Sequence, residues 1–554
     1  MRNYRSLFFA LIIGGILGFS LAANEDRISV VAVKHAQRLI GFEFSETAID
    51  TMVNYLNRNL KGYDTMRSYS NNLTNDIAPP LYFDPLPDDF EFESQQIKID
   101  WQLTDNVELS DDTNELAFYS ISQLASLIKN QKITSTELTK FFIKRIKKYD
   151  HQLFAVISLT EELALKQAAL ADEEIKSGKY RGSLHGIPYG IKDLFAVEGY
   201  KTTWGAAPYK NQILDYNATV VEKLEEAGAV LIAKLTSGAL ARGDVWFGGK
   251  TRNPWDLEQG ASGSSAGSGS ATSAGLVPFS IGTETLGSIT SPATRNGVSG
   301  LRPTYGRVSR YGCMPLSWTM DKPGPLCRNV TDCALVFDVI RGIDTKDRTT
   351  IEAAFNYNPN RDIQKMKIGY LRDQFESDTT SNGVNNEATL EIFRSLGVEL
   401  KAVETPKNIP YDVFDIILRA EAGAFFDELV RSQSDSLMVQ QDGRSRANSL
   451  RQSRFIPAVE YLQANRHRSV LINEFNKIMK ELDVLISPTF GGKQLLITNL
   501  TGHPALAIPN GFDRENHPTS ITLVGNLYDE ASILTLGKAF QEATDFEEKH
   551  PPGF

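Results

Sequence analysis

Residues 260–275 read GASGSSAGSGSATSAG, a tract in which every residue except Thr272 is glycine, serine or alanine. Such a composition is typical of a flexible linker. However, the tract runs directly into 276–281, an apolar segment that is a candidate for a buried strand. Because a flexible linker rarely lies within the body of a folded domain, we expect this tract to be an ordered segment with a function.

The sequence on either side of this tract alternates between helix and strand patterns. Apolar residues recur at helical spacing in 120–128, 134–146, 163–177 and 220–227. Thr134 or Ser135 can cap the second of these helices, and Gly228 is suited to end the fourth. Short apolar runs predict strands at 156–159, 229–234, 484–487 and 505–508. This alternation indicates an α/β layer fold that begins near residue 117.

The composition of the 554 residues excludes several classes of protein. With 41% hydrophobic and 23% charged residues, the chain is neither disordered nor a multi-span membrane protein. The formal net charge is −10, and a general nucleic-acid binder needs a basic surface, so no nucleic-acid partner is expected. Cys313, Cys327 and Cys333 match no common zinc spacing and allow at most one disulfide, so we expect small core residues.

The N-terminal region has a different pattern from the body. Arg2 and Arg5 precede an apolar run, 8–22, that is short for a membrane span and ends in a small-x-small cleavage pattern. We therefore predict a signal peptide over 1–22, an exported protein that is periplasmic or secreted, and no stable membrane span in the mature form. An uncleaved membrane anchor is the alternative. Two helical patterns and a proline-rich linker then predict a helical N-terminal appendage over 24–101.

One interpretation of the small-residue tract is an esterase. Gly263-Ser-Ser265-Ala-Gly267 matches G-x-S-x-G, the nucleophile elbow of α/β-hydrolases, with Ser265 as nucleophile. The elbow needs a strand immediately before it, whereas 256–262 has the pattern of a loop. The partner histidine would have to be His503, His517 or His550.

Other tracts point to a different family. They read Gly186-Ile-Pro-Tyr-Gly-Ile-Lys192-Asp, Asn253-Pro-Trp-Asp256, Gly282-Thr-Glu-Thr-Leu-Gly-Ser288-Ile and Gly300-Leu-Arg-Pro-Thr-Tyr-Gly-Arg-Val-Ser309. Together with Ser262-Gly-Ser-Ser-Ala-Gly-Ser268, and in this order, they resemble the amidase signature family over 117–545. We expect this catalytic domain to be a single large α/β domain with a central mixed β-sheet covered by helices on both faces, plus the helical N-terminal appendage.

The resemblance implies hydrolysis of a carbon–nitrogen amide bond through an acyl-enzyme intermediate. It assigns Ser288 as the nucleophile, Ser264 as a bridging serine on a cis peptide bond, and Lys192 as the general base. Burial lowers the pKa of a lysine from its ordinary value near 10.4, and Lys192 lies in an apolar segment that is consistent with burial. No cofactor and no metal are required.

The resemblance also implies where the substrate is held. The backbone N–H groups of Thr285, Leu286, Gly287 and Ser288 would form the oxyanion hole. Ser237, Gly238 and Ala239 should contribute to substrate binding.

Three positions near the expected nucleophile depart from the family pattern. Glu284 replaces an aspartate and keeps the carboxylate, whereas Leu286 replaces a glycine and Thr290 an arginine. Leucine resists a positive φ, so Leu286 could change the backbone of the oxyanion turn and, together with Thr290, the leaving-group side of the site; their effect on activity stays open.

The sequence leaves alternatives open for the substrate and for the partner proteins. Glutamine is a substrate of family members in tRNA-dependent amidotransferases, which need a second protein as partner, and the predicted export argues against that role. We expect a stand-alone monomer or homodimer that acts on a small-molecule amide. A catalytically silent binding protein with the same fold remains a further alternative.

Overall fold

A central β-sheet organises the computed structural model, which describes residues 28–69, 83–87, 90–378 and 382–554. The sheet has 11 strands: β1 (Val156–Leu159), β2 (Pro188–Lys192), β3 (Val230–Leu235), β8 (Phe279–Glu284), β9 (Ser299–Arg302), β10 (Lys322–Cys327), β11 (Ile368–Leu371), β12 (Leu400–Val403), β13 (Val484–Pro488), β14 (Ala505–Phe512) and β15 (Pro518–Gly525). Their order is β1-β3-β2-β8-β10-β9-β14-β15-β13-β11-β12. The sheet is mixed, because β2 is parallel to β3 and β8, and β11 to β12 and β13, whereas the other neighbours are antiparallel.

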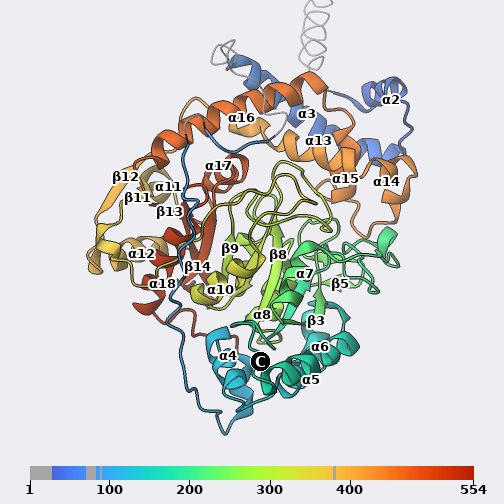
Figure 1. Ribbon diagram of the computed structural model, residues 1–554. Coiled ribbons are helices and arrows are strands. Elements are labelled where there is room, and N and C mark those ends of the chain that lie inside the picture. Colours follow the sequence, from blue (N-terminus) through green and yellow to red (C-terminus); the bar gives the residue numbers. More distant parts are fainter. Residues whose placement is uncertain (1–27, 70–82, 88–89, 379–381) are drawn as a thin grey trace, which may run out of the picture.

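Helices cover both faces of the sheet (Figure 1). The helices after residue 117 are α4 (Ile121–Lys129), α5 (Ser135–Leu153), α6 (Glu161–Lys176), α7 (Thr219–Glu226), α8 (Ala266–Ser273), α9 (Thr290–Asn296), α10 (Val330–Ile340), α11 (Arg372–Glu376), α12 (Gly383–Ser395), α13 (Asp415–Phe425), α14 (Asp427–Arg431), α15 (Arg446–Ser453), α16 (Ala458–Met479), α17 (Gln494–Thr501) and α18 (Glu530–Glu542). The prediction of one large α/β domain with a mixed central sheet is confirmed.

Local sequence signals explain the ends of several helices. Thr134 caps α5 in a capping box, in which its hydroxyl accepts a hydrogen bond from the Glu137 N–H and the Glu137 carboxylate accepts one from the Thr134 N–H. Gly228 has a φ of +81° directly after α7, which lets the chain turn into β3.

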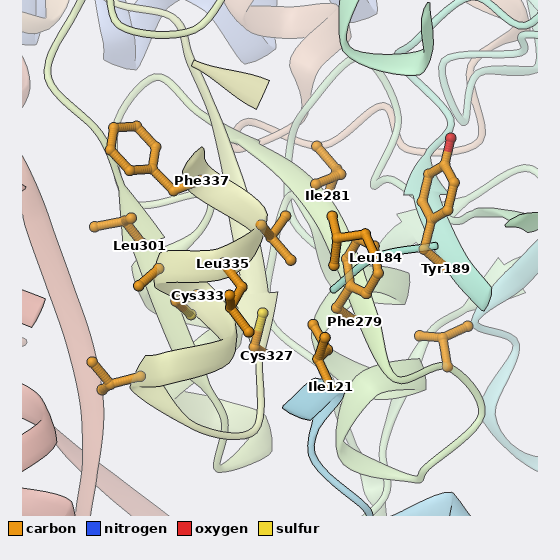
Figure 2. Close-up of a cluster of buried hydrophobic side chains, with 14 of the residues drawn as sticks. Ile121, Leu184, Tyr189, Phe279, Ile281, Leu301, Cys327, Cys333, Leu335 and Phe337 are labelled. Atoms are coloured by element: carbon orange, nitrogen blue, oxygen red, sulfur yellow. The ribbon is translucent and has the colours of Figure 1, made fainter. Parts of the chain in front are cut away.

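The core beneath the sheet is apolar and closely packed (Figure 2). The rings of Tyr189 on β2 and Phe279 on β8 stack with their centroids 5.4 Å apart. Cys327 and Cys333 are buried in the same cluster, and all three cysteines are free thiols. The expectation that the cysteines are small core residues holds for these two, whereas Cys313 is half-buried.

The small-residue tract is an ordered helix and not a linker. All eight residues of α8 are buried. At Gly267 an added Cβ would lie 2.3 Å from the Ala155 carbonyl oxygen and 2.4 Å from the Thr236 nitrogen, so no side chain fits there. Residues of this size allow α8 to pack closely against the sheet and against α9.

The N-terminal residues form two helices that pack on the body, α2 (Val30–Leu39) and α3 (Glu46–Ser68). In Figure 1 they lie beside α13, α15 and α16. The buried amide of Asn59 donates to Gln452 on α15 at 3.0 Å, and Thr51 bonds to Asn448 on the same helix. Further along the chain, Gln96 donates to the carbonyl of Phe355.

Phe279 gives a test of the core. Phe279→Ala should lower the free energy of unfolding by about 3–5 kcal/mol, because it removes a buried ring and leaves a cavity. The measurement is the urea midpoint followed by circular dichroism. Leu170→Ala is the matched control, since Leu170 on α6 is 50% exposed and should change stability by less than about 0.5 kcal/mol. Equal losses would contradict this account of the core.

Candidate active site

Lys192 ends strand β2 and points its amine into a group of hydroxyls. Its Nζ lies 2.8 Å from Ser264 Oγ, 3.0 Å from Ser265 Oγ and 2.9 Å from Thr283 Oγ1. Strand β2 is paired with β3 on one side and with β8 on the other, so the backbone that carries Lys192 lies inside the sheet. The side chain is completely buried.

Burial lowers the pKa of Lys192 to about 7, because desolvation disfavours the ammonium form. Within the described residues, no carboxylate lies within ion-pair distance of this amine. A second buried lysine differs: Lys234 forms an ion pair with Asp193 at 2.7 Å. The Asp193 carboxylate also accepts hydrogen bonds from Thr203, so this aspartate organises the backbone next to Lys192 and does not pair with it.

Ser264 and Ser265 reach Lys192 from the turn before α8. The peptide bond between Gly263 and Ser264 is cis. Gly263 packs closely against the loop at 238–243, where an added Cβ would lie 1.9 Å from the Gly243 carbonyl oxygen. Ser265 Oγ donates to the Thr283 carbonyl at 3.1 Å and accepts from the Thr283 N–H at 3.2 Å, so it is held between the lysine and β8.

Ser288 lies in the turn between β8 and α9, with 8% of its surface exposed. Its carbonyl accepts a hydrogen bond from the Ser265 N–H at 3.2 Å, which ties the two serine-bearing segments together. Among the hydrogen bonds of the described residues, none joins Ser264 Oγ to Ser288 Oγ. Hydroxyls in a catalytic site without substrate are often further apart than in the substrate complex.

The turn that contains Ser288 leaves its backbone donors free. In the part of the chain that the structure describes, no hydrogen bond uses the N–H groups of Thr285, Leu286, Gly287 or Ser288. The positive φ of the turn, +91°, falls on Gly287, and Leu286 has no positive φ. The expectation that Leu286 affects the backbone of the turn is therefore wrong: the position that needs glycine still has one.

Glu284 holds the turn that contains Ser288. Its buried Oε2 accepts from the N–H groups of Ile289 and Thr290, each at 2.9 Å, and from the Thr290 hydroxyl at 3.0 Å. Its Oε1 accepts from Arg302 at 2.7 Å and from Asn499 at 2.8 Å. Although burial alone would raise it, the pKa of Glu284 is lowered to about 2 by Arg302 and these hydrogen bonds.

Asp321 fixes the other side of the same turn. Its carboxylate accepts a hydrogen bond from the Thr285 hydroxyl and from the N–H groups of Leu316 and Ser317. Burial raises the pKa of Asp321. This aspartate was not among the expected site residues, and its place in Asp321-Lys-Pro-Gly-Pro325 was the only signal that could have found it.

A cavity of about 180 Å³ opens beside this turn. Thr283 and Thr285 form part of its wall, as does Leu194, two residues beyond Lys192. Ala241 also lines it, whereas the expected substrate-binding residues do not: Ser237, Gly238 and Ala239 are buried behind it.

The residues expected to bind substrate form a tight loop. Ser237 Oγ donates to the Gly238 carbonyl at 3.0 Å, and the Ala239 N–H donates to the Val245 carbonyl at 2.9 Å. Two arginines of helix α15 also form hydrogen bonds or ion pairs within the protein. Arg446 donates to the carbonyls of Leu240 and Ala241, and Arg451 pairs with Asp435.

The esterase interpretation does not fit this geometry. The strand before Ser265, β7 (Asp256–Gly260), belongs to a separate two-stranded sheet with β6 (Arg252–Asn253). The three candidate histidines have other partners: His503 bonds to Thr501, His517 pairs with Asp256, and His550 stacks on Phe118. Ser265 therefore has a lysine beside it and no histidine among the described residues.

Comparison with known proteins identifies the family. The model of the Amidase family matches residues 137–498. The chain is 31% identical over 486 residues to a glutamyl-tRNA(Gln) amidotransferase subunit of Nitrosococcus oceani, and the match covers 78% of this chain and 99% of the relative. The corresponding protein of Marinomonas sp. is 32% identical over 478 residues, covering 78% of this chain and 98% of the relative. The chain belongs to the amidase family, and it is an enzyme that acts on amide carbon–nitrogen bonds.

Solved structures agree with this assignment. The native peptide amidase of Stenotrophomonas maltophilia superposes with a TM-score of 0.70 at 27% identity, covering 78% of this chain and 98% of the other. The resemblance to the amidase signature family is thereby confirmed.

The predicted location is wrong. The relatives are named as a subunit of an amidotransferase for glutamyl-tRNA(Gln), which contradicts a periplasmic or secreted protein. The predicted signal peptide, 1–22, with its apolar run 8–22, lies outside the described residues. Among the residues that are described, no helix has the length and apolar character of a membrane span. Export therefore gives no reason to exclude glutamine as a substrate.

Glu284 provides a test of the support beneath the turn. Glu284→Ala should destabilise the protein by about 3–5 kcal/mol, because it leaves the buried Arg302 without its counter-charge. The urea midpoint measures the loss. Glu222→Ala is the control, since its ion pair with Lys346 is solvent-exposed and worth less than about 1 kcal/mol. A Glu284 variant as stable as the control would contradict the bracing role.

Proposed function

We propose that the chain hydrolyses a small-molecule amide through an acyl-enzyme on Ser288, with Ser264 as the proton relay and Lys192 as the general base. The single observation that carries the proposal is the completely buried Lys192 amine, 2.8 Å from Ser264 Oγ and without a carboxylate partner among the described residues. A serine hydroxyl is a weak nucleophile at neutral pH and needs such a neutral base within hydrogen-bond reach.

In the first step, Ser288 Oγ attacks the amide carbonyl carbon and passes its proton to Ser264 Oγ, which passes its own proton to Lys192 Nζ. The negative charge that develops on the carbonyl oxygen is stabilised by the N–H groups of the 285–288 turn, which have no other acceptor in the described structure. Substrate binding brings the Ser264 and Ser288 hydroxyls into hydrogen-bond distance.

In the second step, the proton returns from Lys192 through Ser264 to the amide nitrogen, and ammonia or an amine leaves. Water then attacks the ester that links the acyl group to Ser288, and Lys192 takes a proton from it by the same relay. Collapse of this second intermediate breaks the bond between the acyl carbon and Ser288 Oγ, the proton on Lys192 returns through Ser264 to Ser288 Oγ, and the carboxylate leaves.

The proposal extends to the parts of the chain around this centre. Residues 117–545 form the catalytic domain and 24–101 an appendage, of which the helices α2 and α3 pack on the body. The backbone of Ser237, Gly238 and Ala239 supports the substrate by holding the loop that abuts Gly263. The enzyme acts as a monomer or homodimer.

Covalent labelling tests the nucleophile. A fluorophosphonate probe should form an adduct on Ser288, found by peptide mass mapping, and Ser288→Ala should lower kcat/KM by more than about 1000-fold. Ser265→Ala is the comparison variant: it removes one of the three hydroxyls around the Lys192 amine and the two hydrogen bonds of Ser265 to the Thr283 backbone, but neither Ser264 nor Ser288, and should cost less than about tenfold. An adduct on Ser265 instead would favour the esterase. A folded wild type that neither reacts with the probe nor hydrolyses any amide would favour a binding protein.

The pH profile tests the base. Because the pKa of Lys192 is lowered to about 7, and only the neutral amine accepts a proton, kcat/KM should rise through pH 7 and level off above it. Lys192→Met should lose about 100- to 10,000-fold in rate together with this ionisation. A rate that is constant from pH 5 to pH 9 would rule out a lysine base.

A further inference from the structure

The cavity of about 180 Å³ beside the nucleophile turn is lined both by a residue of this turn and by a residue that binds the Lys192 amine. On one side it touches Thr283, which bonds the lysine amine, and on the other Thr285, at the start of the turn. A substituent of an amide whose carbonyl lies over the turn therefore extends into this cavity.

Most of the cavity wall is apolar. Its apolar part includes Leu194, Ala241, Met314, Pro315, Leu316 and Pro323. Trp318 also lines it and is 46% exposed, which places its ring at the mouth. Apolar surface enclosed in this way favours a ligand group that also gains by leaving water.

The charged groups of the wall already have partners. Arg310 binds both oxygens of Asp347, at 3.0 and 3.1 Å, and Lys346 pairs with Glu222 outside the cavity at 2.9 Å. The Asp321 carboxylate is occupied by the hydrogen bonds of the turn and of 316–317.

Lys322 is the remaining ionisable side chain among the residues that line the cavity. Its amine donates to the Met320 carbonyl, and burial holds its pKa well below the ordinary value of a lysine, so it offers no counter-ion. Arg446 lies behind the wall, where it donates to the Leu240 and Ala241 carbonyls. A substrate carboxylate or ammonium in this cavity would lose its hydration without gaining an opposite charge.

We infer that the cavity takes an uncharged, apolar substituent of the amide substrate and discriminates against charged amides such as glutamine. This inference rests on the proposed function. Its support is the composition of the cavity wall, and it does not depend on the predicted export, which was the earlier reason to exclude glutamine.

Three primary amides of equal chain length test it: pentanamide, its ω-carboxylate analogue glutaramate, and glutamine. N-pentylacetamide places an apolar chain on the nitrogen side. We expect kcat/KM for pentanamide or N-pentylacetamide to exceed those for glutaramate and glutamine by about 100-fold, because the charged groups of the latter two would be desolvated without an opposite charge. Trp318→Ala should reduce this ratio by about tenfold. Leu170→Ala, far from the cavity, is the matched control and should leave it unchanged.

The outcomes separate the two proposals. A preference for glutamine or glutaramate, or an apolar preference that survives Trp318→Ala intact, would overturn this inference while Ser288 labelling leaves the proposed function standing. If no amide is hydrolysed and the probe does not label Ser288, the proposed function fails and this inference fails with it.

Discussion

The structure depends on a buried lysine that has no counter-ion. Lys192 and Lys234 are both buried near the centre of the sheet, but only Lys234 has a carboxylate, from Asp193. Lys192 has hydroxyls instead, and a hydroxyl can accept a hydrogen bond from an amine without stabilising its charged form as a carboxylate would. The fold thus uses Asp193 to satisfy one lysine and to order the backbone beside the other. The turn before helix α8 and strand β8 bring the hydroxyls of Ser264, Ser265 and Thr283 to the unpaired amine.

Much of this arrangement could be predicted from the sequence, because it is recorded in short contiguous tracts. The Gly186–Asp193 tract contains both β2 and Lys192, and the apolar periodicity on either side indicates an α/β layer fold. The composition of 260–275 excluded large side chains before the packing of Gly267 was known. Local patterns of this kind need no long-range information, since each tract adopts one element.

The remaining features depend on contacts between distant parts of the chain. Nothing in the sequence near Glu284 indicates that Asn499 would reach it, or that Asp321 would hold Thr285. Leu286 was expected to affect the turn, but whether a position needs a positive φ is decided by the backbone, and here that position is Gly287. The predicted export rested on an N-terminal pattern alone, and the named relatives contradict it. The order of the 11 strands could not be predicted either, because β8, β10 and β9 are neighbours in an order that differs from their order in the chain.

The contact between Glu284 and Asn499 has a consequence for how the protein is made. Asn499 lies on α17, some two hundred residues after the turn that its partner supports, and β13, β14 and β15 come from the same late part of the chain. During synthesis the chain emerges from its N-terminus, and domains fold as units. A nascent chain that has passed β8 but not α17 therefore holds a carboxylate whose hydrogen-bond set is incomplete. The support beneath the turn after β8 is therefore complete only once α17 has been made.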